Sequence, residues 1–469
     1  MIEFEKIPSS IRKPGRYLEF NTSLAVRTLP ANRQKMLIMA QRLAAGTIAA
    51  LKPTAVFSDA DAALYFGEGS MAHLMVRAAI KANPYLDLTV CAMDDAAGSA
   101  AASGTVTIAN AATSSGYLRL WVGNHRIEVA IAKGDAAATV ATALENALFF
   151  LPDLPVTSSI VGTVITLTAR NKGTVAHQID LTVEVTAQGT IGTVVPLANG
   201  AVDANLPTGL AKVVSQQFDI IATPYIEELQ LGSLRDHLDL VSGPMEQRPG
   251  VGVFAMDSSL ATTTTLAAAI DSGRIVCAYL RGTKTPGYEL AAAYAAVLAS
   301  EEDPARPLNT LELKGVSVPD ITQRLTRTEQ EACLANGVAP LEVGPGERVQ
   351  IVRAITTYLH NATGSDDISL LDVTTIRTLD YVRRALRERI ALRFPRTKLS
   401  ARTPGRVRAE ILDVLKKLEE LEIAEMVDDN KDGLIVERSG QDPNRLDVQI
   451  PVDVVNGLHV FAARIDLLL

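Results

Sequence analysis

The sequence has few cysteines and few aromatic residues. Its 469 residues include only 3 cysteines, and phenylalanine, tryptophan and tyrosine together make up 4% of the chain. Cys91, Cys277 and Cys333 are odd in number and far apart, so they predict neither a disulfide framework nor a metal site of the CxxC kind. We therefore expect three buried free thiols in a reducing cytoplasm.

The sequence also lacks an excess of positive charge and a long apolar run. There are 45 lysines and arginines against 53 aspartates and glutamates, and the resulting net charge of −8 disfavours nucleic acid as the main partner. No stretch approaches the roughly 18 apolar residues of a membrane span, and the acidic N-terminus has no signal-peptide pattern. These absences predict a protein that assembles in a cytoplasm without inserting into a membrane.

What is present is a chain long enough for roughly three domains, with clear shifts in composition. Alternating apolar strands and helices on both sides of an Ala, Ser, Gly and Thr-rich stretch predict a parallel sheet that is covered by helices and interrupted by a β-rich insert. The predicted division is an extended N-terminal arm (1–23), an α/β core (24–95 and 201–371), the insert (96–200), a C-terminal α+β domain (372–456) and a C-terminal β-arm (457–469).

The insert contains a hairpin whose register follows from its alternation. Apolar residues alternate up to Gly123-Asn124 and away from it, as a two-residue turn requires. Pairing Val122 with His125 places Leu120 opposite Ile127 on the face that we expect to be core. Two more strands and one helix follow, so we expect a small mixed sheet.

Three polar residues are predicted to cap helices. Ser58 precedes a helix that begins at Asp59, Ser70 precedes the next helix, and Asp135 precedes the helix of the insert. Ser70 also has a second interpretation, because Gly69-Ser70-Met71-Ala72 looks like the turn around a subtilisin nucleophile. The order is wrong for that protease, since no histidine occurs among the 69 residues before Ser70. We therefore interpret Ser70 as a helix cap.

A second motif resembles a calcium-binding loop. Asp428, Asn430, Asp432 and Gly433 fit loop positions 1, 3, 5 and 6, but Ser439 stands at position 12, where the loop needs a bidentate glutamate. The residues after Gly433 alternate as a strand does. An acidic turn between helix and strand is therefore the favoured interpretation, with calcium binding as the alternative.

No nucleotide site is predicted either. Gly250-Val251-Gly252 is followed by a strand rather than a helix, and the sequence has no glycine-lysine loop of the Walker type. Without a convincing catalytic, metal or phosphate-binding constellation, the sequence predicts no cofactor and no enzymatic activity.

The strongest local charge bias lies between Arg377 and Arg408. This run holds 11 lysines and arginines against Asp380 and Glu388, and few aromatic residues interleave with them. We expect a protein contact, with acidic surface such as Glu419–Glu422 and Glu425 on a neighbouring subunit, or acidic surface on another protein of the assembly, as its complement. A solvated helix face is the alternative. The residues assigned to this basic contact face are Arg383, Arg384, Arg387, Arg393, Arg396 and Lys398.

Both ends of the chain contain segments that look like unpaired strands. The last strand, Gly457–Leu469, is long, apolar and free of proline, and such an edge invites association. Donation to the sheet of a neighbour would cover it, and the same holds for the N-terminal arm with Pro8 and Pro14. The residues assigned to these inter-subunit arms are Tyr17, Leu18, Phe20, Leu458, Val460, Phe461, Ile465 and Leu467.

The order of several motifs resembles that of the Mu-like bacteriophage tail sheath proteins. The N-terminal segment Ile7-Pro8-Ser9 with Lys13–Phe20 is similar to the N-terminal arm of that family. The insert motifs Gly123–Arg126 and Leu167–Gly173, and the strand and turn Phe218–Tyr225, also match in order and spacing. The resemblance covers essentially the whole chain.

This resemblance implies a subtilisin-like α/β core without the protease chemistry, and a structural subunit of a contractile tail. Such a subunit polymerises around the tail tube as a helical homo-polymer of sixfold rings, and its partners are the tube, the baseplate and the tail terminator proteins. It assembles in an extended, metastable state in the bacterial cytoplasm and contracts by subunit rearrangement. The alternatives are the sheath of a phage-derived bacteriocin or other injection machine, and a subtilisin-like hydrolase.

Overall fold

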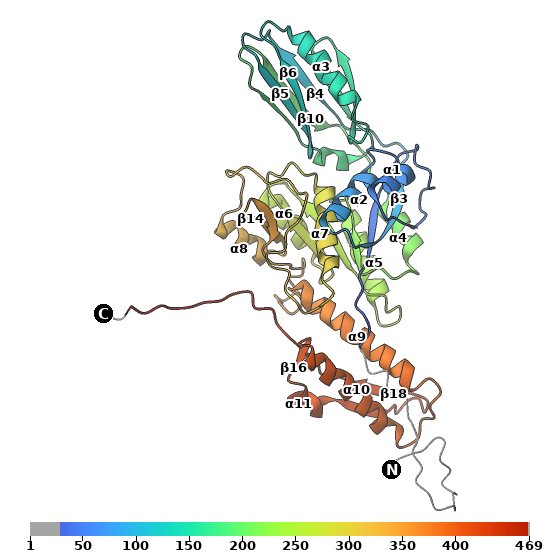
Figure 1. Ribbon diagram of the computed structural model, residues 1–469. Coiled ribbons are helices and arrows are strands. Elements are labelled where there is room, and N and C mark those ends of the chain that lie inside the picture. The colour runs from blue at the N-terminus through green and yellow to red at the C-terminus, as the bar shows by residue number, and fades with distance from the viewer. Residues whose placement is uncertain (1–28, 468–469) are drawn as a thin grey trace, which may run out of the picture. The chain divides into compact units, whose positions relative to one another are not determined.

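The structure is a computed structural model that describes residues 29–467 (Figure 1). Its contacts divide the described chain into two compact units, one of residues 32–380 and 454–467, the other of residues 29–31 and 381–453. The predicted arm residues Tyr17, Leu18 and Phe20 lie outside the described residues.

An eight-stranded sheet forms the centre of the first unit. Its strand order is β15-β14-β13-β12-β11-β1-β3-β2. The strands from β14 to β3 run parallel, and β15 and β2 are antiparallel edges. The predicted parallel sheet is thus confirmed. The strands are β1 (Lys35–Gln41), β2 (Thr54–Ala55), β3 (Asp87–Met93), β11 (Ile220–Ala222), β12 (Val251–Met256), β13 (Ile275–Tyr279), β14 (Ala339–Gly344) and β15 (Arg348–Ile351).

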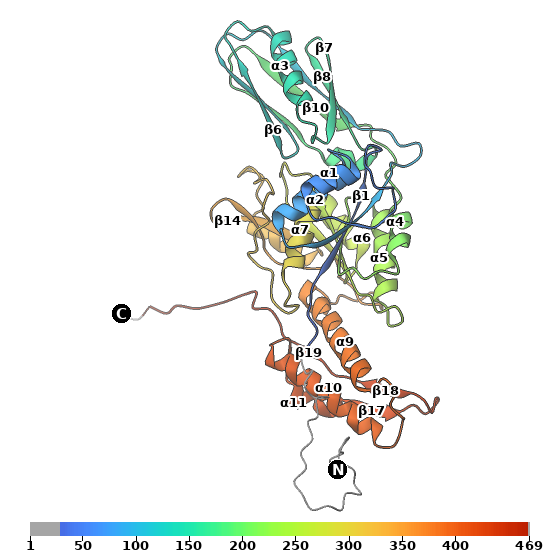
Figure 2. The same ribbon diagram turned by 45° about the vertical axis from the view of Figure 1, so that its right-hand side comes forward.

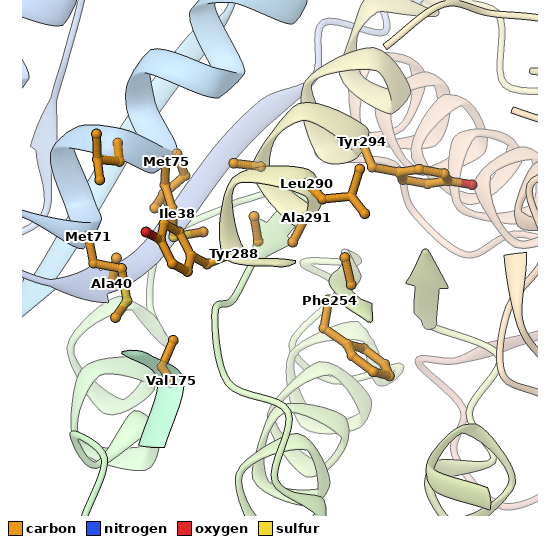
Figure 3. Close-up of a cluster of buried hydrophobic side chains, with 14 of the residues drawn as sticks. Ile38, Ala40, Met71, Met75, Val175, Phe254, Tyr288, Leu290, Ala291 and Tyr294 are labelled. Carbon is orange, nitrogen blue, oxygen red and sulfur yellow. The ribbon is translucent and has the colours of Figure 1, made fainter. Parts of the chain in front are cut away.

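Helices cover both faces of this sheet. Figure 2 shows α2 and α7 against one face and α4, α5 and α6 against the other. Every residue of α7 except the last is buried, because alanines let the helix approach the strands closely. Met75 of α2, Ile38 of β1 and Tyr288 of α7 gather in one core cluster (Figure 3). The helices are α1 (Asp59–Phe66), α2 (Met71–Ala82), α4 (Leu206–Val213), α5 (Glu228–Ser242), α6 (Leu260–Ile270), α7 (Gly287–Ser300) and α8 (Arg327–Ala335).

The segment between β3 and α4 forms sheets of its own. It contains two antiparallel sheets, β10-β4-β8-β7 and β6-β5-β9, rather than the single mixed sheet that we expected. An antiparallel bridge between Ala100 and Ala201 brings the two ends of the segment together. Its elements are β4 (Ser103–Ala109), β5 (Gly116–Val122), β6 (His125–Ile131), α3 (Ala137–Phe149), β7 (Val156–Val161), β8 (Val164–Ala169), the 3-10 helix η1 (Thr174–Gln178), β9 (Leu181–Val185) and β10 (Ile191–Ala198).

The predicted hairpin register is confirmed, and one predicted helix cap is wrong. Val122 pairs with His125 and Leu120 with Ile127 in the β5–β6 ladder. Ser58 and Ser70 accept the capping hydrogen bonds expected of them. Asp135, however, accepts a bond from the backbone N–H of Ala132 at 2.7 Å, and α3 begins without a side-chain cap. The carboxylate closes the preceding turn instead.

The second unit is built on two helices and a short hairpin. Residues of α9 from Tyr381 onward pack against α10 in a separate core, and α9 has the predicted bounds. Among the described strands, β17 and β18 pair only with each other. The elements are α9 (Val373–Arg393), α10 (Thr403–Glu420), β16 (Ala424–Glu425), α11 (Val427–Asn430), the 3-10 helix η2 (Lys431–Gly433), β17 (Ile435–Arg438), β18 (Leu446–Gln449) and β19 (Asp453–Val454).

The described part of the C-terminal segment contains no strand. After β19 the chain continues to residue 467 without helix or strand, so the prediction of a strand from Leu458 is wrong for the isolated chain. A strand is defined by the ladder it forms, and residues 457–467 have no pairing partner among residues 29–467. None of the described helices is both long and apolar enough to cross a membrane.

Candidate functional site

Ser70 and its surroundings do not form a nucleophilic centre. Ser70 is fully buried at the start of α2, and its Oγ accepts a hydrogen bond from the backbone N–H of His73 at 3.1 Å. The His73 ring uses Nδ1 to accept from the backbone N–H of Gly69 at 3.1 Å, and Nε2 lies 3.0 Å from Asp59. Both ring nitrogens are therefore engaged elsewhere than the Ser70 hydroxyl. The described residues thus lack the nucleophile–base pair that catalysis by Ser70 requires.

Arg77, one turn after His73 on α2, ties α1 to the insert. Its guanidinium donates to Asp59 at 3.1 Å and to Asp153 at 2.8 Å. Burial lowers the pKa of His73 and of His125, and the charge of Arg77 lowers both further. Both histidines are therefore neutral near pH 7, and Arg77 is the cation that its two carboxylate partners hold in place.

The hairpin turn of the insert rests on the start of α7. Asn124 Nδ2 donates to Glu289 Oε2 at 3.2 Å, and Thr285 Oγ1 donates to Asn124 Oδ1 at 2.8 Å. The Lys284 ammonium lies 3.4 Å from the centroid of the Trp121 ring. No local pattern in the sequence predicts this contact, because Asn124 and Thr285 are 161 residues apart.

A second joint involves the motif at the end of β8. Asn171 Oδ1 accepts from the backbone N–H of Met71 at 2.8 Å, and its Nδ2 donates to the carbonyl of Arg42 at 3.0 Å. Asp95 Oδ1 accepts from Gln41 Nε2 at 2.7 Å and from Asn171 Nδ2 at 3.3 Å. Directional hydrogen bonds thus hold the insert against the α/β sheet at two separate places.

The Glu289 carboxyl makes the first joint sensitive to pH. Burial raises the pKa of Glu289 to about 7, so the folded protein holds this proton more tightly than the unfolded chain. Stability from this group is therefore complete near pH 4 and decreases as pH rises to about 7. We expect Glu289→Gln to match the parent at pH 4 to 5 and to exceed it by up to about 3 kcal/mol at pH 8.

Thermal unfolding of the two proteins between pH 4 and 8 tests this expectation. The difference between them isolates Glu289 from other shifted groups such as Asp257, whose pKa burial raises to about 6. Fluorescence of Trp121, the single tryptophan, reports whether the joint opens first. A difference that does not change with pH would show that Glu289 titrates normally.

Residues 428–433 fold as helical turns rather than as a calcium loop. They belong to α11 and η2, and Gly433 lacks the positive φ that a calcium loop demands of its glycine. Asp428 is 3.3 Å from Lys416 Nζ and 3.4 Å from Lys431 Nζ, so its carboxylate forms ion pairs with two lysines. Over the described residues, no cluster of three or more histidine, cysteine or acidic side chains is placed to hold a metal ion.

The basic run divides between outward and inward side chains. Arg387, Arg396 and Lys398 are exposed, and Arg383 and Arg384 are half-buried. Arg393 differs from the prediction: its guanidinium lies 3.3 Å from Glu410 of α10 and its side chain is only 11% exposed. It joins Arg389, which pairs with the same carboxylate, in holding α9 to α10. Sequence alone could not separate the two groups, because which face of α9 meets α10 is a tertiary contact.

The C-terminal segment presents apolar side chains to solvent. Leu458, Val460, Phe461, Ile465 and Leu467 are each between 78 and 94% exposed. Side chains of this kind are normally covered in a folded protein, and a run of them in an extended segment marks an association surface. The five residues predicted for the C-terminal arm thus lie in one segment, and all of their side chains are exposed.

Two parts of the chain match known families. Residues 199–357 match the phage tail sheath protein central domain, and residues 365–467 match the phage tail sheath C-terminal domain. The Mu-like prophage FluMu tail sheath protein of Haemophilus influenzae is 32% identical over 100% of both chains. The chain belongs to the phage tail sheath family.

Solved structures agree with the fold of this sheath protein. The sheath tail protein of Desulfitobacterium hafniense is similar with a TM-score of 0.53 and 15% identity, over 95% of this chain and 97% of that one. A chain of the contracted sheath complex of the extracellular contractile injection system PVC gives a TM-score of 0.50 and 12% identity, over 98% of both chains. The mixed α/β fold is therefore one that sheath proteins share, and the predicted resemblance to Mu-like tail sheaths is confirmed.

Proposed function

We propose that this tail sheath protein polymerises with itself by donating its terminal arms to the sheets of neighbouring subunits. The observation that carries the proposal is the uncovered apolar segment after Gly457, which alternates as a strand does and pairs with no strand in the part of the chain that the structure describes. Strand addition gives affinity through main-chain hydrogen bonds and register through alternate side chains. A head-to-tail contact of this kind builds an open helix rather than a closed dimer.

The β17–β18 hairpin is the acceptor that we propose. It pairs with no third strand of the described chain, so both of its edges are open. Ile435 and Val448 on the hairpin are exposed. The edges of the large sheet are poorer acceptors for an added strand. The edge strand β2 has only two residues, and the backbone of residues 310–313 already bonds to the other edge strand, β15. An isolated two-stranded hairpin gains most from added strands.

The mechanism that follows needs no catalysis. Subunits assemble as a helical polymer of sixfold rings around the tail tube in an extended, metastable packing, and contraction moves them to a lower-energy packing while the arms stay joined. The baseplate and the terminator proteins lie at the two ends of this polymer. The sheath is assembled in the bacterial cytoplasm, is part of the virion tail and drives the tube through the host envelope.

The exposed cations of the basic face fit a role in these protein contacts. Arg387, Arg396 and Lys398 are exposed on α9 and on the connection to α10, and the acidic residues Glu420 and Glu422 are exposed at the C-terminal end of α10 and just after it. Opposite charges at the two ends of one unit favour contact between successive copies, or with an acidic tube surface. Nucleic acid is disfavoured by the net charge of −8.

A core of subtilisin-like fold leaves a hydrolase as the competing function, and one variant separates the two. We expect the purified protein to form tubes under the electron microscope, and Ser70→Ala to form the same tubes. Because Ser70 only caps α2, its replacement should cost about 1 kcal/mol of stability. The absence of tubes together with casein cleavage that Ser70→Ala abolishes would instead establish the hydrolase.

A further inference from the structure

The first residues of the C-terminal arm are held in place before the exposed part begins. The His459 side chain is only 14% exposed, whereas its neighbours Leu458 and Val460 are 80 and 78% exposed. From Val460 to Leu467 every residue is exposed. A single side chain thus marks the boundary between the docked and the uncovered part of the segment.

Two side chains face the ring nitrogens of His459, and a third holds one of them. Asn309 Nδ2 lies 3.1 Å from Nδ1, and Asp372 Oδ1 lies 3.6 Å from Nε2. Arg353 fixes the Asp372 carboxylate with two hydrogen bonds of 2.8 and 2.7 Å. Because the amide of Asn309 donates to Nδ1, the neutral ring carries its proton on Nε2. Nε2 lies near the Asp372 carboxylate but makes no hydrogen bond within the described residues. Burial lowers the pKa of His459, which keeps the ring neutral at pH 7.

The backbone just before His459 is fitted to the same place. A Cβ atom on Gly457 would lie 2.5 Å from Cγ of Pro307 and 2.9 Å from Nε2 of His459. Any larger residue would therefore push the segment off its contact. Glycine at this position lets the chain pass close to Pro307 while the next ring turns inward.

We propose that His459 is a latch: it anchors the root of the C-terminal arm on Asn309 and Asp372 and so fixes the point from which the arm reaches a neighbouring subunit. This inference rests on the proposed donation of the arm. An arm that leaves from a fixed point loses less conformational freedom when it pairs than one whose root is loose. The latch therefore acts as a positioning contact that pre-organises assembly without touching the acceptor.

The test compares critical concentrations for polymerisation, measured by sedimentation. His459→Ala and Asn309→Ala should each raise the critical concentration by roughly three- to tenfold, since one anchored side chain is worth about 0.5–1.5 kcal/mol of ordering. The double variant should be no worse than the worse single one, because both remove the same contact. Gly457→Ala should act in the same direction. Far-UV circular dichroism should remain unchanged in all of them.

His360→Ala serves as the matched control. His360 also pairs with an aspartate, Asp271 at 2.8 Å, and its printed polar partners, Asp271 and Asp366, lie outside the arm. An unchanged critical concentration in His459→Ala and Gly457→Ala, or an equal rise in His360→Ala, would overturn the latch. If removal of the whole arm also left assembly intact, the proposed donation itself would be wrong, so the two failures are distinguishable.

Discussion

A chain that ends at Asn456 is expected to fold and to stay monomeric. The removed segment is Gly457 to Leu469. In its described part, residues 457–467, the apolar side chains are exposed and the His459 contacts are the main ones to the rest of the subunit. Folding should therefore survive, whereas the donated strand is lost entirely. Sedimentation should show monomer-sized particles, and circular dichroism should show retained helix and strand.

A full-length chain with Phe461→Ser and Ile465→Ser provides the matched control. It keeps the backbone of the arm but replaces two apolar side chains that are 84 and 94% exposed in the isolated subunit. The stability of the free subunit should therefore stay the same, whereas binding of the arm to a neighbour, which buries these side chains, should weaken. Removal of Met1 to Phe20 is expected to block polymerisation in the same way. Normal tubes from either truncation, or global unfolding on loss of the C-terminal segment, would show that assembly rests on other surfaces.

Deletion of the insert, residues 96–200, is expected to leave polymerisation intact and to give tubes of smaller outer diameter. The antiparallel bridge between Ala100 and Ala201 places the two ends of the insert side by side, so a short linker can close the gap. We expect the insert to be the outermost part of the tube, because its ladder residues Arg119 and Glu128 form a polar face.

The deletion also removes groups that the rest of the subunit uses. Glu289 loses its hydrogen bond from Asn124, and Arg77 loses its carboxylate partner Asp153. The shortened protein should therefore melt at a lower temperature than the parent. Electron microscopy measures the diameter, and an insert found at the lumen of the parent tube would contradict the expectation.

The parts of the fold that sequence predicts well are those set by near neighbours. The β5–β6 register follows from alternation around Gly123-Asn124, and the cap at Ser70 follows from the three residues after it. Asp135 shows the limit of such reasoning, because a turn and a cap compete for one carboxylate within a few residues. In both cases a short polar side chain accepts a hydrogen bond from a backbone N–H three residues away.

The joints of the insert and the roles of the arginines follow from the tertiary structure. Nothing near Asn124 in the sequence indicates Glu289, and nothing near Arg393 indicates that it faces Glu410 while Arg387 faces solvent. Both depend on which helix packs where, and side-chain pairing across elements carries no period that a single sequence reveals.

By itself the sequence determined the alternation of strands and helices, the parallel sheet and the apolar, proline-free C-terminal arm, because backbone propensity and hydrophobic period are local properties. Only the tertiary structure decided that residues 457–467 pair with no other described strand and that His459 docks at Asn309 and Asp372. The physical reason is that a strand forms only when it pairs with another strand, and His459 is held only where its partner side chains lie. Asn309 and Asp372 are far from His459 in sequence, and we propose that the strand that pairs with the arm belongs to another subunit.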